Sequence, residues 1–121
     1  MSGPPKKIVV LAAIVIALAT IALFWPAVRN DFVNFDDLDY VVNNHHVQSG
    51  LTLRTFQWAF THTVSCNWHP LALLSHALDC QLYGLEPWGH HLTSVLLHGA
   101  NAALLCLLLY RLTGALWRSF F

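Results

Sequence analysis

The chain opens on an apolar run that is long enough to cross a lipid bilayer. From Ile8 to Trp25 the sequence has 18 residues, and Thr20 is the one polar residue among them. As an α-helix rising about 1.5 Å per residue, the run would cover roughly 27 Å, close to the thickness of the hydrocarbon core. Only 10% of the whole chain is charged, whereas soluble domains carry roughly 25% charged residues. These features predict an integral membrane protein.

A cleaved signal peptide is the alternative for this run, because it too lies near the amino terminus. Signal peptides have an apolar core of roughly 7–15 residues, followed by a cleavage site with small residues. This run is longer, and it ends in Leu23, Phe24 and Trp25, which fit such a site poorly. The sequence therefore favours an uncleaved transmembrane helix over residues 8–28, preceded by an amino-terminal segment, 1–7.

A second apolar stretch predicts another transmembrane helix over residues 88–110. Its apolar core runs from Leu92 to Tyr110, and Pro87 precedes it, in a position suited to the first turn of a helix. Within it, His98 and Asn101 lie three residues apart and therefore share one helical face, next to Gly99. Polar residues at bilayer depth usually face other helices, and small residues allow close approach.

We therefore expect His98, Gly99 and Asn101 to pack against further transmembrane helices of the same or another chain. Lipid is the other expected partner. The formal net charge of the chain is zero, so no basic surface for nucleic acid is expected.

The charged residues predict the orientation of the two spans. Basic residues flank both spans on the same side: Lys6, Lys7, Arg111 and Arg118. The connecting segment, 29–87, holds six acidic residues and two arginines, a net charge of −4. The positive-inside rule places both termini, 1–7 and 111–121, in the cytoplasm and the loop outside it. For a bacterial inner membrane, the loop would be periplasmic.

Two short helices are predicted within this loop. Thr52 can cap a helix from Leu53 to Phe60, because a threonine side chain satisfies an amide at a helix start. A second helix begins at Pro70 and stops at Gly84, and it is too short to cross a bilayer. Its leucine stripe suits a position in the membrane interface. The predicted fold class is thus an all-α membrane protein with two spans and an extracytoplasmic loop of short interfacial helices.

The adjacent carboxylates Asp36 and Asp37 are the sharpest chemical feature of the loop. Neighbouring carboxylates repel each other, so that one can act as a general base while the other orients a bound group. A hydrated acidic turn is the alternative interpretation of this pair.

The loop also contains residues that could bind a metal ion. Cys66, His69, His76 and Cys80 have types that tetrahedral zinc accepts, although their spacing matches no standard zinc finger. The simpler interpretation is that no metal binds here. A Cys66–Cys80 disulfide is a further alternative outside the cytoplasm.

From Asp31 to Gly114 the sequence resembles bacterial membrane proteins with tetratricopeptide repeats, which are related to the transmembrane and tetratricopeptide-repeat-containing O-mannosyltransferases. The residues that carry the resemblance are Phe35-Asp36-Asp37, Tyr40-Val41-Val42-Asn43-Asn44, Gly50-Leu51-Thr52, Trp58-Ala59-Phe60, Asn67-Trp68-His69-Pro70-Leu71, Ser75-His76, Leu78-Asp79, Gln81-Leu82-Tyr83-Gly84-Leu85, Gly89-His90-His91-Leu92, Leu96-Leu97-His98, Asn101-Ala102 and Thr113-Gly114-Ala115-Leu116-Trp117.

The resemblance implies a GT-C type glycosyltransferase, which takes a sugar from a polyprenyl-phosphate carrier and needs no tightly bound cofactor. In such enzymes an acidic motif of the first extracytoplasmic loop lies at the active site, and here that motif is Asp36-Asp37. One of the two would deprotonate a protein hydroxyl, which then attacks the sugar. Arg54 and His69 are candidates for binding the phosphate by their chemistry alone.

The family continues through further spans and helical repeats, whereas this sequence stops at Phe121. We therefore expect an amino-terminal fragment of a larger bundle that is inactive as this short chain, and whether it is an enzyme stays open. One alternative is a non-enzymatic two-span subunit that packs with other helices. The other is a metal-binding loop on a membrane anchor.

Overall fold

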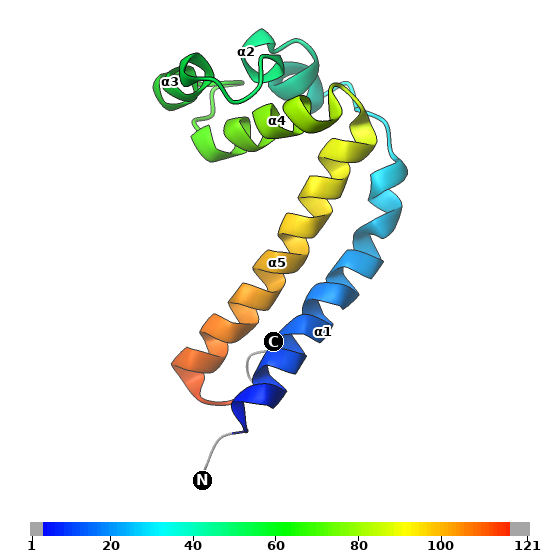
Figure 1. The fold of residues 1–121 in the computed structure, drawn as a ribbon, viewed down its shortest axis with the longest axis vertical. Coiled ribbons are helices and arrows are strands. Elements are labelled where there is room, and N and C mark those ends of the chain that lie inside the picture. Colours follow the sequence, from blue (N-terminus) through cyan, green and yellow to red (C-terminus); the bar gives the residue numbers. More distant parts are fainter. Residues whose placement is uncertain (1–3, 117–121) are drawn as a thin grey trace. The chain divides into compact units, whose positions relative to one another are not determined.

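The structure, a computed structural model, describes residues 4–116, and the regular elements within that range are helical. In chain order they are α1 (Lys6–Phe24), the 3₁₀ turn η1 (Trp25–Arg29), the π-helical turn η2 (Leu38–Val42), α2 (His45–Gln48), α3 (Leu53–Thr61), α4 (Pro70–Tyr83) and α5 (Pro87–Thr113) (Figure 1). The chain divides into two compact units. The helical-pair unit holds the described residues up to Ala27 and from Ser94 onward, and the loop unit holds Val28–Thr93.

In the helical-pair unit, α1 lies beside α5 and runs in the opposite direction (Figure 1). Two stretches, Lys6–Arg29 and Pro87–Thr113, are long and apolar enough to cross a membrane. Few of their residues are buried within the protein, and large apolar side chains such as Leu18 and Leu104 are exposed. A lipid environment removes this surface from water. The predicted pair of membrane-length helices is confirmed, with both helices extending slightly past 8–28 and 88–110. The two predicted terminal segments, 1–7 and 111–121, lie partly outside the described residues.

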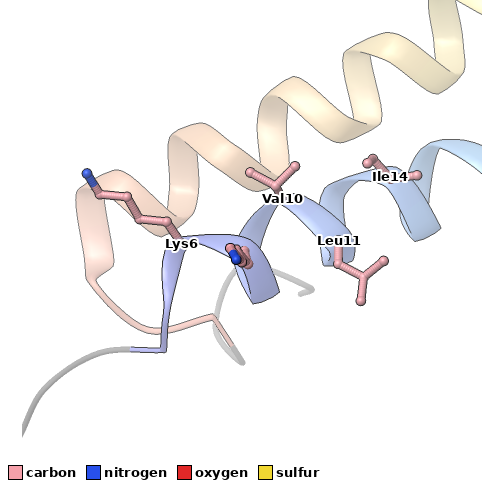
Figure 2. Close-up of a pocket in the computed structure, with 5 residues that line it drawn as sticks. Lys6, Val10, Leu11 and Ile14 are labelled. Carbon is pink, nitrogen blue, oxygen red and sulfur yellow. The ribbon is translucent and has the colours of Figure 1, made fainter.

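The start of α1 shows the change from polar to apolar surface that is typical of a membrane boundary. Lys6 lies at the amino end of the helix, and Val10, Leu11 and Ile14 follow along it (Figure 2). Together with Lys7 they line a shallow, open and almost wholly apolar groove. Such a surface is suited to contact with acyl chains rather than to recognition of a polar ligand.

Helices α1 and α5 approach each other closely at Gly99. A Cβ atom at this position would lie 2.7 Å from Cγ1 of Ile21 and 3.1 Å from the carbonyl oxygen of Ala17. Next to it, the His98 ring meets Phe24 edge-on, with 4.8 Å between ring centroids. Asn101 is exposed. The close helix packing expected at Gly99 is thus made by α1 of the same chain.

The loop unit has its own small apolar core, formed by η2, α2, α3 and α4. The buried core residues are Val41, Val47, Ala59, Leu73, Ala77 and Cys80. Helix α4 contributes Leu73, Ala77 and Cys80 to it, at helical spacing, whereas Leu71 and Leu82 on another face are exposed. Because α4 has apolar residues on two faces, one face builds the core and the other stays an apolar outer surface.

Local sequence signals set the bounds of the two longer loop helices. Thr52 caps α3, since its side-chain oxygen accepts a hydrogen bond from the Thr55 amide at 3.0 Å. Pro70 occupies the first turn of α4, and Gly84 follows its last residue with a φ of +65°, a conformation that favours glycine. Both predicted helix starts are confirmed, and α3 ends one residue later than expected.

Replacing Thr52 by alanine should lower the free energy of unfolding of the loop unit by about 1 kcal/mol, because the cap of α3 is lost. Thr61→Ala is the matched control. Its hydroxyl donates to the Gln57 carbonyl within the last turn and caps no amide. Chemical denaturation in mild detergent, followed by circular dichroism, measures both. Equal effects of the two substitutions would contradict a role for Thr52 as a cap.

Candidate functional site

An open cleft of ≈ 370 Å³ in the loop unit is lined mainly by polar residues. The residues that line it are Asp36, Asp37, Tyr40, Asn67, His69, Ala72 and His76. They come from three places in the sequence: the stretch from Asp36 to Tyr40, which runs into η2, the segment before α4, and the first half of α4. Folding therefore brings the predicted acidic pair and the predicted His69 to one place.

The two carboxylates of the cleft are held differently. Asp37 is partly buried, and its Oδ2 accepts a hydrogen bond from the Val33 amide at 2.8 Å. This bond fixes the carboxylate against the chain segment that precedes it. Asp36 is exposed to solvent. The pair thus offers one positioned carboxylate and one that solvent and a ligand can reach.

Tyr40 and His69, which also line the cleft, contact each other. The Tyr40 hydroxyl lies 2.7 Å from Nε2 of His69, and the two rings are stacked with 5.5 Å between centroids. The hydroxyl also donates to the Val64 carbonyl oxygen at 3.2 Å. Because tyrosine has one hydroxyl hydrogen, that bond leaves the His69 Nε2–H to donate to the Tyr40 oxygen. The contacts fix the orientation of His69 in the cleft.

Arg54, the other predicted phosphate-binding residue, does not line the cleft. It is an exposed residue of the first turn of α3. The sequence could not indicate this, because Arg54 was selected by its charge alone and its helix packs elsewhere on the core. The structure therefore supports only His69 of the two as a residue of this site.

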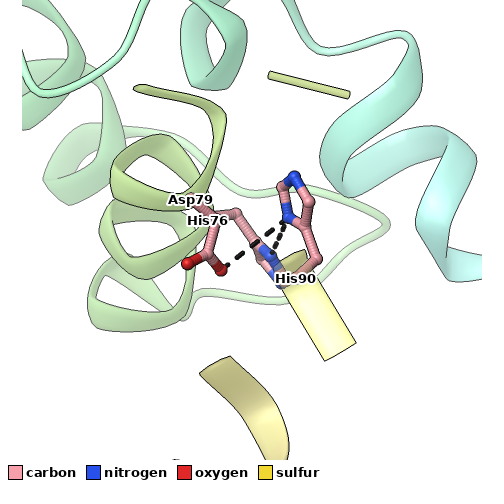
Figure 3. A group of neighbouring side chains, drawn as sticks. All are labelled: His76, Asp79 and His90. Carbon is pink, nitrogen blue, oxygen red and sulfur yellow. Dashed lines mark hydrogen bonds and ion pairs between the residues drawn. The ribbon is translucent and has the colours of Figure 1, made fainter. Parts of the chain in front are cut away.

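His76 lines the cleft and also belongs to a second group of side chains, with Asp79 and His90 (Figure 3). Nδ1 of His90 lies 3.5 Å from Nδ1 of His76 and 3.7 Å from Oδ2 of Asp79. Burial, and then the nearby His90, lower the pKa of His76, against the smaller opposing influence of the Asp79 and Asp37 carboxylates. His76 is therefore favoured in its neutral form, as a possible hydrogen-bond acceptor or ligand.

Sequence reasoning missed this second group. His76 and Asp79 are three residues apart on a predicted helix, which places them on neighbouring positions of one face. His90 comes from the next helix, α5, across the turn at Gly84. Sequence spacing predicts which residues are neighbours within one helix. It does not predict which residues of two different helices become neighbours across a turn.

The alternative metal-binding set, Cys66, His69, His76 and Cys80, is not the group of ligands that the fold brings together in the described residues. Within residues 4–116, the group close enough to share one ion is His76, Asp79 and His90. Cys66 is exposed in a turn with a φ of +65°, and His69 is engaged by Tyr40. Cys80 is buried in the core, where burial and then Asp79 raise the pKa of its thiol.

The disulfide alternative is also absent from the described structure. Cys66, Cys80 and Cys106 are all free thiols, and Cys66 is exposed whereas the other two are buried. A buried thiol with a raised pKa is a poor nucleophile. Cys80 therefore acts as a small apolar residue of the core.

Comparison with protein-family models, with curated proteins and with solved structures finds no match to this chain. The case for a function therefore depends on the cleft and on the sequence motifs that surround it.

Proposed function

We propose that the loop unit is the acidic active-site loop of a membrane glycosyltransferase. The enzyme would move a sugar from a polyprenyl-phosphate carrier to a protein hydroxyl. The observation that carries this proposal is the single cleft in which Asp36 and Asp37 lie with Tyr40 and His69. Two membrane-length helices in the same chain give such an enzyme access to a lipid-linked donor.

The two carboxylates would have different roles in activating the acceptor. Asp36, which is exposed, accepts the proton of the acceptor hydroxyl, and Asp37, held by the Val33 amide, orients the acceptor. The acceptor oxygen then forms a bond to the anomeric carbon. The bond from that carbon to the phosphate oxygen breaks, and its electron pair leaves with the lipid phosphate.

The departing phosphate needs hydrogen-bond donors or positive charge. Asn67 and His69 line the cleft and carry donors, a side-chain amide and an imidazole ring, whereas the Tyr40 hydroxyl hydrogen is already donated to the Val64 carbonyl oxygen. Because the Nε2–H of His69 is directed at Tyr40, His69 would stabilise the phosphate oxygen through the Nδ1–H of a protonated ring as negative charge develops there. Its contact with Tyr40 would hold the ring in place for this task.

A transfer assay tests the proposed reaction. The gene product that contains this chain is isolated from its own membranes in detergent. It is then supplied with radiolabelled polyprenyl-phosphate hexoses and a serine- and threonine-rich acceptor peptide. The expected result is label on the peptide with at least one of the hexoses. A protein that stays folded and transfers none of them would overturn the proposal.

We further propose that the protein lies in a bacterial inner membrane, with both termini in the cytoplasm and the loop unit in the periplasm. The support is the distribution of charge, since the basic residues flank the spans and the acidic ones lie between them. In this orientation the cleft faces the compartment in which lipid-linked sugars are used for transfer outside the cell.

The native cysteines provide a test of this orientation. A membrane-impermeant maleimide should label right-side-out inner-membrane vesicles at Cys66, because this thiol is exposed and Cys80 and Cys106 are buried. Inverted vesicles should stay unlabelled, and Cys66→Ser should abolish the signal. Mass spectrometry of the labelled peptide identifies the site. Labelling of inverted vesicles alone would reverse the proposed topology.

A further inference from the structure

We propose that His76, Asp79 and His90 form a binding site for a divalent transition-metal ion such as zinc. The three side chains offer two imidazole nitrogens and one carboxylate oxygen, all within 4.8 Å of one another. Asp79 and His90 are almost fully buried, with 2% and 3% of their surfaces exposed. Figure 3 shows the three converging from α4 and from the start of α5.

The spacing of the ligand atoms is close to that of a tetrahedral site. With metal–ligand bonds of about 2.0–2.1 Å, neighbouring ligand atoms lie roughly 3.3–3.4 Å apart. Nδ1 of His90 is 3.5 Å from Nδ1 of His76 and 3.7 Å from Oδ2 of Asp79. Two of the three separations are therefore within a few tenths of an ångström of the tetrahedral spacing. The third, between the ligand atoms of His76 and Asp79, would reach that spacing through small side-chain rotations.

The surroundings of His90 leave its Nδ1 atom, the one that faces His76 and Asp79, as the nitrogen that can bind a metal ion. Nε2 of His90 lies 3.1 Å from the Gly84 carbonyl oxygen, which can only accept, so Nε2 carries a hydrogen and donates it. In the neutral ring this leaves the lone pair on Nδ1, the atom that faces His76 and Asp79. A histidine ligand whose other nitrogen donates to a backbone carbonyl is the usual arrangement at metal sites.

The surroundings of Asp79 leave one carboxylate oxygen for a cation. Oδ1 accepts a hydrogen bond from the Thr93 hydroxyl at 2.6 Å, and Oδ2 faces His90. A buried carboxylate is costly unless a positive charge compensates it. A metal ion would supply this charge, and the alternative source is a proton on His90, which would make an imidazolium–carboxylate pair.

The ligand types select the class of metal. Imidazole suits zinc, cobalt, iron and copper, whereas magnesium and calcium prefer oxygen ligands. Three protein ligands also leave a coordination position for water or another group, as in zinc sites that are not purely structural. His76 lines the acidic cleft as well, so the site shares a residue with the cleft. The metal site does not depend on sugar transfer, because its ligands alone define it.

Metal titration of the intact gene product in detergent tests the proposal. The protein is stripped with a chelator, dialysed and titrated with Co²⁺ and then Zn²⁺, with metal content measured by mass spectrometry. We expect about one ion per chain and the strong visible absorption of four-coordinate Co²⁺, which Zn²⁺ then removes. His90→Ala should lose both signals, and His45→Ala, at an exposed histidine outside the group, should keep them.

A substitution outside the three ligands separates a loss of metal binding from a loss of folding. Thr93→Val preserves the side-chain shape and removes the hydrogen bond to Asp79, and it should weaken Co²⁺ binding by about 10–100-fold. Helix content by circular dichroism confirms that each variant is folded. No Co²⁺ spectrum in the wild-type protein, or binding that folded His90→Ala retains in full, would overturn the proposal in favour of the imidazolium–carboxylate pair. Magnesium alone is expected to leave the stripped protein without bound metal.

Discussion

Replacing Asp36 by asparagine is expected to lower the rate of sugar transfer by at least about a hundredfold, the usual contribution of a general base. The amide keeps the size of the side chain and cannot take the proton of the acceptor hydroxyl. Asp36 is exposed in the cleft, so the substitution removes a reacting group and little packing. The loss should appear in kcat, because a proton transfer is part of the reaction step and not of binding.

Asp37→Asn should act differently, because Asp37 is held by the Val33 amide and positions the acceptor in this proposal. The asparagine oxygen can still accept that hydrogen bond. We expect a smaller fall in kcat together with a rise in KM for the acceptor. Transfer of radiolabelled sugar at several acceptor concentrations separates the two parameters.

Asp31→Asn provides the matched control, since it removes an exposed carboxylate that does not line the cleft. Its transfer rate should equal that of the unaltered protein. If folded Asp36→Asn and Asp37→Asn both transfer sugar at that rate, the acidic pair is a hydrated turn and the proposed function fails. Co²⁺ binding at His76, Asp79 and His90 would be unchanged by that outcome, so the two proposals can fail separately.

The parts of the fold that could be predicted are those that local chemistry decides. The membrane-length helices follow from apolar length and composition, since the cost of leaving such a surface in water does not depend on tertiary detail. Thr52, Pro70 and Gly84 fixed the start of α3 and both limits of α4, because caps and stops involve groups within one turn of each other.

The candidate site could be predicted only in part, because it depends on contacts between elements. Asp36 and Asp37 stood out as adjacent carboxylates, and the fold brings His69 to them. His90 was missed, because the turn at Gly84 brings it from α5 to α4. Arg54 does not line the cleft with His69, since charge alone does not predict the direction in which a helix face points.

Gly99→Leu should have the largest effect on stability, because it places a bulky side chain where α1 and α5 touch. Even the first carbon of a side chain at this position would lie 2.7 Å from Ile21 and 3.1 Å from the Ala17 carbonyl oxygen. The carbonyl belongs to the backbone of α1 and cannot move aside without shifting the helix. Overpacking of this kind costs about 1–3 kcal/mol, and in a membrane the helix pair depends on close packing for its association.

Ala100→Leu is the matched control, because it adds the same side chain one residue further along α5, at an exposed position. Titration with SDS in mixed micelles, read out by proteolysis of the opened chain, compares the free energy of unfolding of the two variants. Gly99→Leu should unfold at a clearly lower SDS fraction, and Ala100→Leu should match the unaltered protein. Gly99→Ala should be intermediate, since it adds only the Cβ. Equal stability of all four proteins would show that α1 does not pack on Gly99, and the small residue would then be open to a helix from another chain, as a two-span subunit without enzymatic activity requires.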